Sequence, residues 1–499
     1  MISRRCLGPL AVMLSVVHVW MPAIAQTCTT PLFSSLSGSR GGNTVVLNQP
    51  QPNGNPNYEY VPSIMQDGVY RMWFCQGNYG PAGQYYGDRI SLSTATSLSG
   101  PWSAATAVFL PSGGSASNFD YFHVCDPSVV RVNGVYYMYY GGHNNIPYGQ
   151  PGHRTTAIGV ATSTNGTSWT RMNGGAPIIT AFLDENNPGY AAEPNKYGAG
   201  QPSVVFLDGY FYLAYTDTTG FDSNPVNGAG IYVLRSTDPT FQSGVEELTS
   251  AGFETRTALT WTRHSIIEAF SVDIQFSDMV DGFAIVDVTS PGGIKHMRVS
   301  FFNRAMTSHL VTSPLSEIYI AGDWSEGPGI VSRPDKHSVP SATNCDRIPI
   351  DIIRSVGASV FDGLAHVGVD INTGLSCSCA RLPKVFEDQG LAPTGFPWAI
   401  VKDGQRLHFQ LLGPMQQLTK NFYPVTNTIY SAIPGGASMF SGDPVYYSTG
   451  TPGAFYLNDG RLWPVSCLAA VTANNSSMTF IPLWQWSSYP IGPALFCVQ

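Results

Sequence analysis

The feature that most constrains this chain is a strand, turn and strand unit that occurs three times in the first half of the sequence. The copies begin at Val61, Asp126 and Gln201, so that 65 and then 75 residues separate their starts. Each copy places Pro near the start of its first strand, where a missing amide hydrogen does least harm. Each then turns at Asp-Gly or Asn-Gly, a pair that tolerates the positive φ of a tight hairpin, and continues into an aromatic-rich strand. A period longer than a hairpin indicates a repeat architecture.

An apolar third strand follows each hairpin, and weaker copies of the unit begin near Asp273 and Glu326. Four-stranded units at this spacing are typical of β-propeller blades, whose radial packing leaves only short edges. We therefore expect an all-β protein with a five-bladed β-propeller over residues 26–375. The pattern changes after this segment, and we expect a smaller C-terminal β module over residues 376–499, with a sixth blade as the alternative.

Few charges and many turn-forming residues agree with this fold. Only 12% of the residues are charged, whereas the chain contains 52 Gly and 37 Pro residues. Such a composition favours an all-β protein with many tight turns. The formal net charge is −8, and phosphate binding requires a concentrated basic surface. We therefore expect no nucleic-acid partner.

Residues 1–25 have the features of a signal peptide. Arg4 and Arg5 precede an apolar run over residues 7–20, and a small-residue cleavage pattern follows at Ala25. The same arginines also resemble a twin-arginine export signal, and both routes lead out of the cytoplasm. No later stretch reaches about 18 uncharged apolar residues, the length that a membrane helix needs. We expect a secreted or periplasmic protein without a membrane span.

The cysteines favour disulfide bonds over a metal site. Cys6 is lost with the signal peptide, and an even set in an exported chain is typical of disulfides. The remaining eight are Cys28, Cys75, Cys125, Cys345, Cys377, Cys379, Cys467 and Cys497. The sequence does not fix their pairing, although Cys467 and Cys497 are a reasonable local pair. Zinc-site spacing with histidine partners and phosphate-binding glycine loops are missing, so we expect no metal and no other cofactor.

The starts of the repeats place acidic residues in one ring. The first strand of each propeller blade lines the central channel, and its entry point faces one rim. The repeat aligns Val61, Asp126, Gln201, Asp273 and Glu326 at this rim. Glycosidic cleavage requires one protonated carboxyl group for the leaving oxygen and one carboxylate to activate water or attack carbon. Taken singly, each acid fits a turn or capping role better than catalysis, and it is their joint position that indicates hydrolysis.

The segment that starts at Asp126, Asp-Pro-Ser-Val-Val followed by Gly134 and Tyr136-Tyr137, resembles the blade-opening motif of the five-bladed propeller glycosidases. This superfamily includes arabinanases, β-xylosidases and arabinofuranosidases and is represented by glycoside hydrolase family 43, which is inverting. The resemblance implies that Asp126 is the general base, Asp273 the acid that tunes the site, and Glu326, in a Glu-Gly-Pro context, the proton donor. Glu193, shortly before the third repeat, is the alternative donor.

Other side chains near the rim are candidates for holding a sugar. Aromatic faces stack on the apolar C–H groups of sugar rings, whose hydroxyls need hydrogen bonds. A core position is the simpler explanation for any single aromatic residue. The substrate-binding residues that we expect are Trp73, Tyr121, His123, His143, Tyr148 and Gln201.

Together these features predict a secreted, monomeric glycoside hydrolase that cleaves an extracellular polysaccharide or oligosaccharide. The alternative is a carbohydrate-binding or cell-surface β-propeller without catalysis. Val61 favours this alternative, because the family places its base in the first blade, where this chain has an uncharged side chain. An adhesive role of the C-terminal module is a third hypothesis.

Overall fold

The computed structural model describes residues 28, 33, 36–49, 59–80, 82–147, 150–182, 196–220, 222–256, 264–289, 296–310, 316–319, 327–356 and 363–498. Strands dominate this part of the chain, as expected, and its helices are few and short. None of the described helices is long and apolar enough to cross a membrane. The predicted signal peptide lies outside the described residues.

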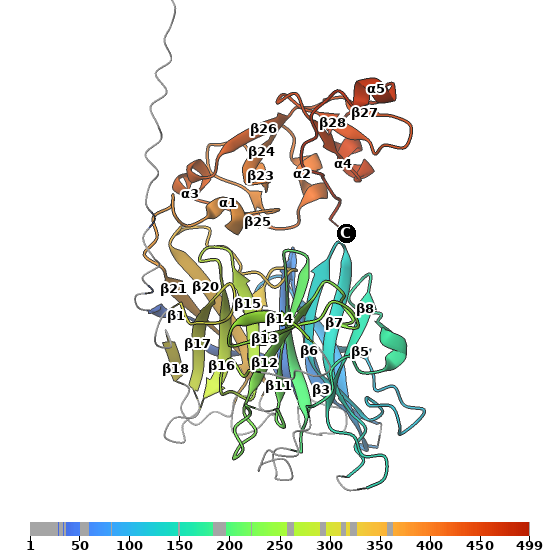
Figure 1. Ribbon diagram of the computed structural model, residues 1–499. Helices are drawn as coiled ribbons and strands as arrows, with labels where there is room; N and C mark the ends of the chain where they lie inside the picture. Colours follow the sequence, from blue (N-terminus) through green and yellow to red (C-terminus); the bar gives the residue numbers. More distant parts are fainter. Residues whose placement is uncertain are drawn as a thin grey trace, which may run out of the picture.

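Residues 59–372 form successive sheets of antiparallel strands (Figure 1). The first strands of these sheets contact one another in a closed ring, in the order β2, β6, β10, β15, β19 and back to β2. The strands are β2 (Glu59–Asp67), β3 (Val69–Tyr79), β4 (Tyr85–Ala95), β5 (Thr106–Phe109), β6 (His123–Val132), β7 (Val135–His143), β8 (Ala157–Ser163), β9 (Thr170–Arg171), β10 (Ala199–Leu207), β11 (Tyr210–Asp217), β12 (Ile231–Ser236), β13 (Glu246–Thr249), β14 (Gly252–Thr255), β15 (Val272–Ser277), β16 (Gly282–Thr289), β17 (His296–Asn303), β18 (Ser316–Tyr319), β19 (Gly329–Ser332), β20 (Arg347–Ser355) and β21 (Leu364–Asn372).

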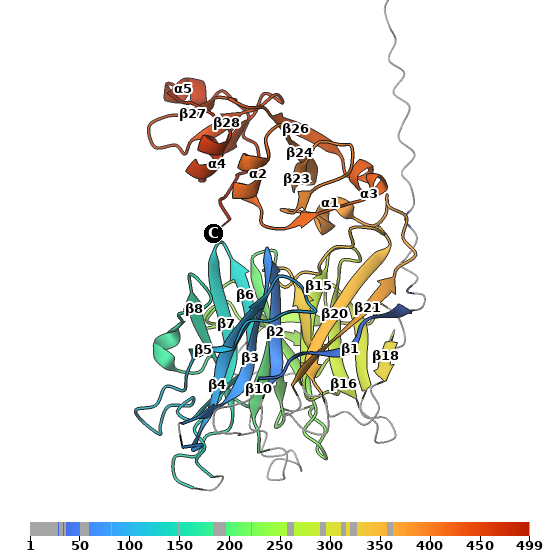
Figure 2. The ribbon, with the colours of Figure 1, turned by 180° about the vertical axis from the view of Figure 1, so that it is seen from behind.

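Two pairings join the first and the last of these sheets. β19 runs parallel to β2, with Val331 opposite Ile64. β1 (Leu36–Leu47) pairs antiparallel with β21, beside which it lies in Figure 2. The first and last strands of this region therefore belong to one eight-stranded sheet, which ties the two ends of the ring together.

A ladder of hydrogen bonds links the first strands of consecutive sheets. Ser63 Oγ accepts from the Val129 amide at 3.0 Å. Two more links of the same kind follow, from the Val204 amide to Ser128 Oγ at 3.0 Å and from the Ile274 amide to Ser203 Oγ at 2.9 Å. In the next link the acceptor is a carboxylate, because Asp273 Oδ2 accepts from the Ile330 amide at 2.6 Å. Asp273 therefore occupies the position of the three serines.

One end of the ring is closed by the loop between β19 and β20. Its carbonyl oxygens accept hydrogen bonds from three of the first strands, in the pairs Arg131 to Pro334, Phe206 to Asp335 and Phe276 to Lys336. The Lys336 side chain is buried, and its amine lies 2.5 Å from Asp273 Oδ1. Ser203 Oγ donates to the same oxygen at 2.6 Å. The ion pair of Asp273 and Lys336 therefore fixes the loop to the serine ladder.

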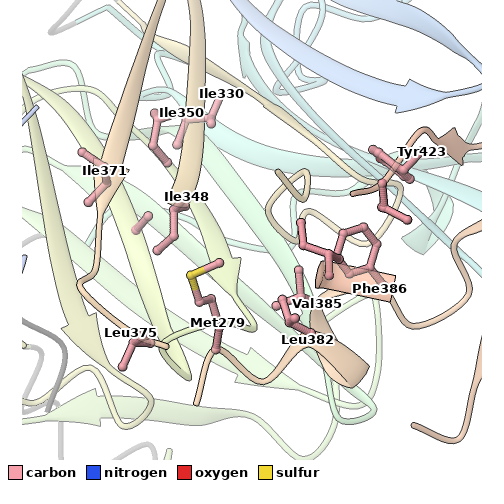
Figure 3. Packing of buried hydrophobic residues seen from close by; sticks show 14 of the residues in the cluster. Met279, Ile330, Ile348, Ile350, Ile371, Leu375, Leu382, Val385, Phe386 and Tyr423 are labelled. Atoms are coloured by element: carbon pink, nitrogen blue, oxygen red, sulfur yellow. The ribbon is translucent and has the colours of Figure 1, made fainter. Parts of the chain in front are cut away.

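The C-terminal region, residues 376–498, packs against this closed end. Its helix α1 (Leu382–Val385) shares a hydrophobic core with the last sheets of the ring, in which Met279 and Ile348 pack with Leu382 and Phe386 (Figure 3). Arg333 Nη1, from the closing loop, donates to the Val385 carbonyl at 3.0 Å. The region is thus held by apolar packing and by buried polar contacts.

Four disulfide bonds pair the eight cysteines among the described residues. Cys467 bonds to Cys497, as predicted. Cys28 bonds to Cys379 and Cys345 to Cys377, so two of the bonds attach the start of the C-terminal region to earlier parts of the chain. Cys75 of β3 bonds to Cys125 of β6 and joins two neighbouring sheets directly beside Asp126.

The C-terminal region consists of two units with the same topology, displaced by 56 positions. In each unit a hairpin turns at Asp-Gly, at Asp403 and again at Asp459. The bridge between Arg406 and Gly435 recurs between Leu462 and Ile491, 56 positions later. The elements of the first unit are β22 (Gly390–Leu391), β23 (Ala399–Lys402), β24 (Gln405–Phe409), α2 (Leu412–Leu418), β25 (Phe422–Tyr423), α3 (Asn427–Ala432) and β26 (Gly435–Met439). Those of the second unit are β27 (Val445–Tyr447), β28 (Ala454–Tyr456), β29 (Leu462–Pro464), α4 (Leu468–Ala473), β30 (Met478–Phe480) and α5 (Leu483–Trp486).

We predict that Asp273→Asn destabilises the fold, because it leaves the buried amine of Lys336 without its counter-charge. Removing one partner of a buried ion pair costs about 3–5 kcal/mol of unfolding free energy, which chemical denaturation would measure. Asp273→Asn combined with Lys336→Met should recover part of the loss. Asp208→Asn is the control, since its exposed carboxylate pairs with a half-exposed Arg304. Equal stability of Asp273→Asn and the wild type would contradict the structural role of this pair.

Candidate active site

Three residues at the starts of β2, β6 and β10 share an unusual backbone conformation. Val61, Asp126 and Gln201 have φ values of 47°, 51° and 48°. Each lies where the pairing with the next strand shifts register. Left-handed φ is rare for residues with a Cβ and occurs where a bulge re-aims a side chain. The three residues are therefore equivalent, as the sequence repeat predicted.

The fourth and fifth repeats differ from the predicted alignment. The serine ladder makes Asp273 equivalent to Ser203, which places Ser271, two residues earlier, at the position of Asp126 and Gln201. The alignment was two residues out of register here, because this copy lacks the Pro that marks the others. In the fifth repeat the equivalent position is Gly327, whose φ is 61°. Glu326 itself lies outside the described residues.

A cavity of about 590 Å³ opens beside Asp126, at the end of the ring opposite the closing loop. Among the described residues, the carboxylates that line it are those of Asp88 and Asp126. The lining residues are Tyr60, Asp88, His123, Cys125, Asp126, Gly141, Gly142, His143, Asn145, Ile146, Pro147, His153, Thr156, Lys196, Tyr197 and Phe270. Two predicted substrate-binding residues, His123 and His143, belong to this set.

The Asp126 carboxylate lies against Gly141 of β7 and the side chain of Tyr197, which precedes β10. The Tyr197 hydroxyl donates to Asp126 Oδ2 at 3.2 Å. A Cβ on Gly141 would lie 3.0 Å from the same oxygen, so the glycine leaves room for the carboxylate. Gly200 likewise leaves room for the Tyr197 ring, whose hydroxyl would lie 2.2 Å from an added Cβ. Asp126 is 5% exposed, which means that it meets the cavity through a small part of its surface.

His123 is oriented by a second carboxylate that the sequence analysis did not single out. Its Nδ1 lies 2.8 Å from Asp88 Oδ2, and the Tyr85 hydroxyl donates to Asp88 Oδ1 at 2.5 Å. A carboxylate on one ring nitrogen fixes the tautomer and the orientation of an imidazole. The only sequence signal was an acid just after the aromatic pair Tyr85-Tyr86.

His143 and His153 continue this row of imidazoles, with ring centroids about 6 Å apart from one neighbour to the next. Burial and the adjacent His123 and His153 lower the pKa of His143 to about 4. Its Nδ1 accepts from the Asn145 amide at 2.9 Å. At neutral pH His143 is therefore a neutral hydrogen-bonding group.

The other predicted substrate-binding residues that the structure describes do not line the cavity. Trp73 is fully buried, donates from its indole nitrogen to the Gly166 carbonyl and packs on Trp169. Tyr121 and the buried Gln201 are described but do not line the cavity. Tyr148 and Glu193 lie outside the described residues.

Glu59, two residues before Val61, is a further buried acid. Burial raises its pKa to about 7, while the Gln49 backbone and the Gln76 side chain act in the opposite direction. A carboxyl group of this kind is half-protonated near neutral pH. It does not line the cavity in the described structure, so burial alone does not make it part of the site.

The comparisons with known proteins identify relatives that are glycoside hydrolases. The relatives are arabinan endo-1,5-α-L-arabinosidases, which confirms the resemblance predicted from the Asp126 motif. A probable arabinan endo-1,5-α-L-arabinosidase A of Aspergillus flavus is 30% identical over 156 residues, which are 30% of this chain and 46% of the relative. That of Neosartorya fischeri is 36% identical over 138 residues, 27% of this chain and 37% of the relative. The chain thus spans less than half the length of these relatives. No family model matches the chain.

Solved structures give weaker likenesses. A family 117 glycoside hydrolase of Zobellia galactanivorans has a TM-score of 0.43 at 13% identity, over 67% of this chain and 91% of that one. The catalytic domain of a family 62 α-L-arabinofuranosidase of Coprinopsis cinerea has a TM-score of 0.43 at 11% identity, over 70% and 99%. Likenesses at this level do not establish a shared activity.

We predict that His143 makes the protein less stable in acid. The unfolded chain protonates this imidazole below pH 6.5, whereas the folded protein resists protonation until about pH 4. Stability is therefore lost as the pH falls between these values. His143→Asn should reduce the drop in melting temperature between pH 7 and pH 4.5. His264→Asn, at a half-exposed histidine, is the control. The same drop in His143→Asn and wild type would refute the assignment.

Proposed function

We propose that this protein is a secreted glycoside hydrolase that cleaves arabinofuranosyl linkages of an arabinan-like polysaccharide in the cavity beside Asp126. The observation that carries the proposal is the position of Asp126. It is the acid of the motif that resembles the glycosidases, and it lines an open cavity together with tyrosine and histidine side chains. The relatives named for arabinan cleavage support the substrate class.

We infer further that residues 26–375 form a five-bladed β-propeller and residues 376–499 a separate C-terminal module. The closed ring of first strands and the joining of the first and last sheets support the blade count. The two-unit repeat after residue 376 supports the boundary. In this arrangement the open end of the propeller carries the chemistry, and the closed end carries the module.

In the proposed reaction Asp126 acts as general base. It accepts a proton from a water molecule, whose oxygen attacks the anomeric carbon, while an acid donates a proton to the leaving oxygen. Tyr197 would hold the carboxylate by its hydrogen bond. His123, oriented by Asp88, and neutral His143 would bind sugar hydroxyls.

For the proton donor we propose Glu326, with Glu193 as the alternative. Lys196 and Tyr197, which follow Glu193 closely in the chain, line the cavity. The residue after Glu326, Gly327, lies against Val61 at the ring position equivalent to Asp126. Asp273, the predicted tuning acid, would influence the proton donor only through its charge and from a distance. Its two oxygens already bind Lys336, Ser203 and the Ile330 amide.

The second candidate function is a carbohydrate-binding propeller without catalysis. It is favoured by one observation, that Val61 and Gln201 occupy two of the three equivalent bulge positions with uncharged side chains. Such a protein would retain arabinan without releasing reducing ends.

We predict that Asp126→Asn lowers kcat on linear arabinan by about 10²- to 10⁴-fold, the contribution of a positioned acid or base. Its melting temperature should stay within about 2 °C of wild type, because the amide preserves the shape of the side chain. Reducing-end release measures the activity, and Asp208→Asn, at an exposed carboxylate, serves as control. Normal hydrolysis by Asp126→Asn would refute the site. Binding by the wild type without any hydrolysis would favour the second function.

We predict that Glu193→Gln and Glu326→Gln identify the proton donor when their activities are compared on two substrates with different leaving groups. An aryl arabinofuranoside with an acidic phenol needs little protonation, so the donor variant should retain activity on it while losing about 10²-fold or more on arabinan. The other variant should behave like the control Glu268→Gln, a change in a side chain that binds Asn224. If neither variant loses more activity on arabinan than on the aryl arabinofuranoside, neither residue is the donor.

A further inference from the structure

Helix α5 of the second unit and the residues after it leave half-buried the positions that the equivalent helix α3 of the first unit buries. In the first unit Ile429, Tyr430 and Ile433 are buried in the core shared with the ring. Their equivalents 56 positions later are Gln485, Trp486 and Tyr489, which are only half-buried. In Figure 1, α5 lies on the side of this region away from the sheets. Among the described residues, these three equivalents belong to neither of the hydrophobic cores that hold the C-terminal region.

Aromatic rings gather in this second unit. Tyr446 lies 5.8 Å from Tyr456 and 6.2 Å from Tyr489 between ring centroids, with interplanar angles of 30° and 27°. Tyr446 is therefore stacked with both neighbours, whereas the rings of Tyr456 and Tyr489, 5.2 Å apart, are tilted by 57° to each other. Trp484 of α5, between these elements in the chain, is 75% exposed, and Phe480 is 55% exposed. We call the rings of Tyr446, Tyr456 and Tyr489, together with the exposed rings of Phe480 and Trp484 in the same unit, the aromatic surface.

The aromatic surface is almost without charge. Between residues 444 and 498 the charged residues are Asp459 and Arg461, whereas serine, threonine, asparagine and glutamine are frequent. Protein interfaces draw on arginine as well as aromatic residues and carry a polar rim. A neutral sugar chain instead needs ring faces for its C–H groups and uncharged hydrogen-bonding partners for its hydroxyls. The chemistry of this surface matches the sugar chain.

We propose that the aromatic surface is a second carbohydrate-binding site, which holds a neutral polysaccharide chain of the class proposed for the Asp126 cavity. The inference rests on the proposed function for its choice of polysaccharide. The C-terminal region packs at the closed end of the ring, where the Gly68 amide donates to Asn421 Oδ1. The cavity opens at the other end, so the two sites do not compete. The surface would anchor the protein on a polymer while the cavity processes a different part of it.

We predict that Trp484→Ala and, separately, Tyr489→Ser weaken retention on insoluble linear arabinan by about tenfold, as expected for an aromatic contact at the centre of a binding surface. Both variants should cleave a soluble arabinotriose at the wild-type rate. Val226→Ser, at an 82% exposed apolar side chain of the ring, is the matched control. Retention is measured by sedimentation with the polysaccharide, and folding by melting temperature.

Three outcomes decide the proposal. Weaker retention with unchanged cleavage of arabinotriose supports it. Unchanged retention of both folded variants overturns it. A concentration-dependent dimer that either variant abolishes also overturns it, because the surface would then be a protein interface. Asp126→Asn should keep full retention. A wild-type protein that binds arabinan through Trp484 but does not cleave it would refute the proposed hydrolysis and leave the second site standing.

Discussion

The hydrogen bonds between consecutive first strands are the interaction on which the rest of the structure depends. A short polar side chain on each strand accepts from the backbone of the next, through Ser63, Ser128, Ser203 and then Asp273. These links are buried, and a buried polar group left unpaired costs about 1–3 kcal/mol. They therefore fix the height of each strand relative to its neighbour. Because Val61, Asp126 and Gln201 each lie two residues before a serine of the ladder, the ladder also sets the level at which these side chains meet the open end.

In the fourth link an aspartate takes the place of the serine. This aspartate allows the end of the ring opposite the Asp126 cavity to be closed. A carboxylate has enough acceptor sites to serve the ladder and still bind the amine of Lys336. The closing loop then hydrogen-bonds to three further strands, and the C-terminal region packs against it through Arg333 and Val385. The loop and the C-terminal region thus cover the end of the ring opposite the cavity that Asp126, Tyr197 and the histidines line.

The sequence predicted those parts of the structure that depend on local chemistry. Pro followed by Asp-Gly or Asn-Gly located the hairpins, and the equivalence of Val61, Asp126 and Gln201 followed from this repeat. Asp273 was misaligned by two residues because its copy lacks the proline, and its register is set by bonds to Ser203 and the Ile330 amide, 70 and 57 residues away. The contact of His123 with Asp88 joins different sheets and has no local signal. The two-unit repeat of the C-terminal region was not predicted, although its two Asp-Gly pairs, at Asp403 and Asp459, lie 56 positions apart.

The proposed function requires that a sugar is bound and cleaved at the open end of the ring, against Asp126. The most direct test is a crystal structure of Asp126→Asn soaked with a linear arabino-oligosaccharide. We expect a furanose ring in the cavity, with its anomeric carbon facing residue 126 and its hydroxyls bonded to Tyr197, His123 or His143. An empty cavity at saturating ligand, or a sugar bound only to the C-terminal region, would contradict it.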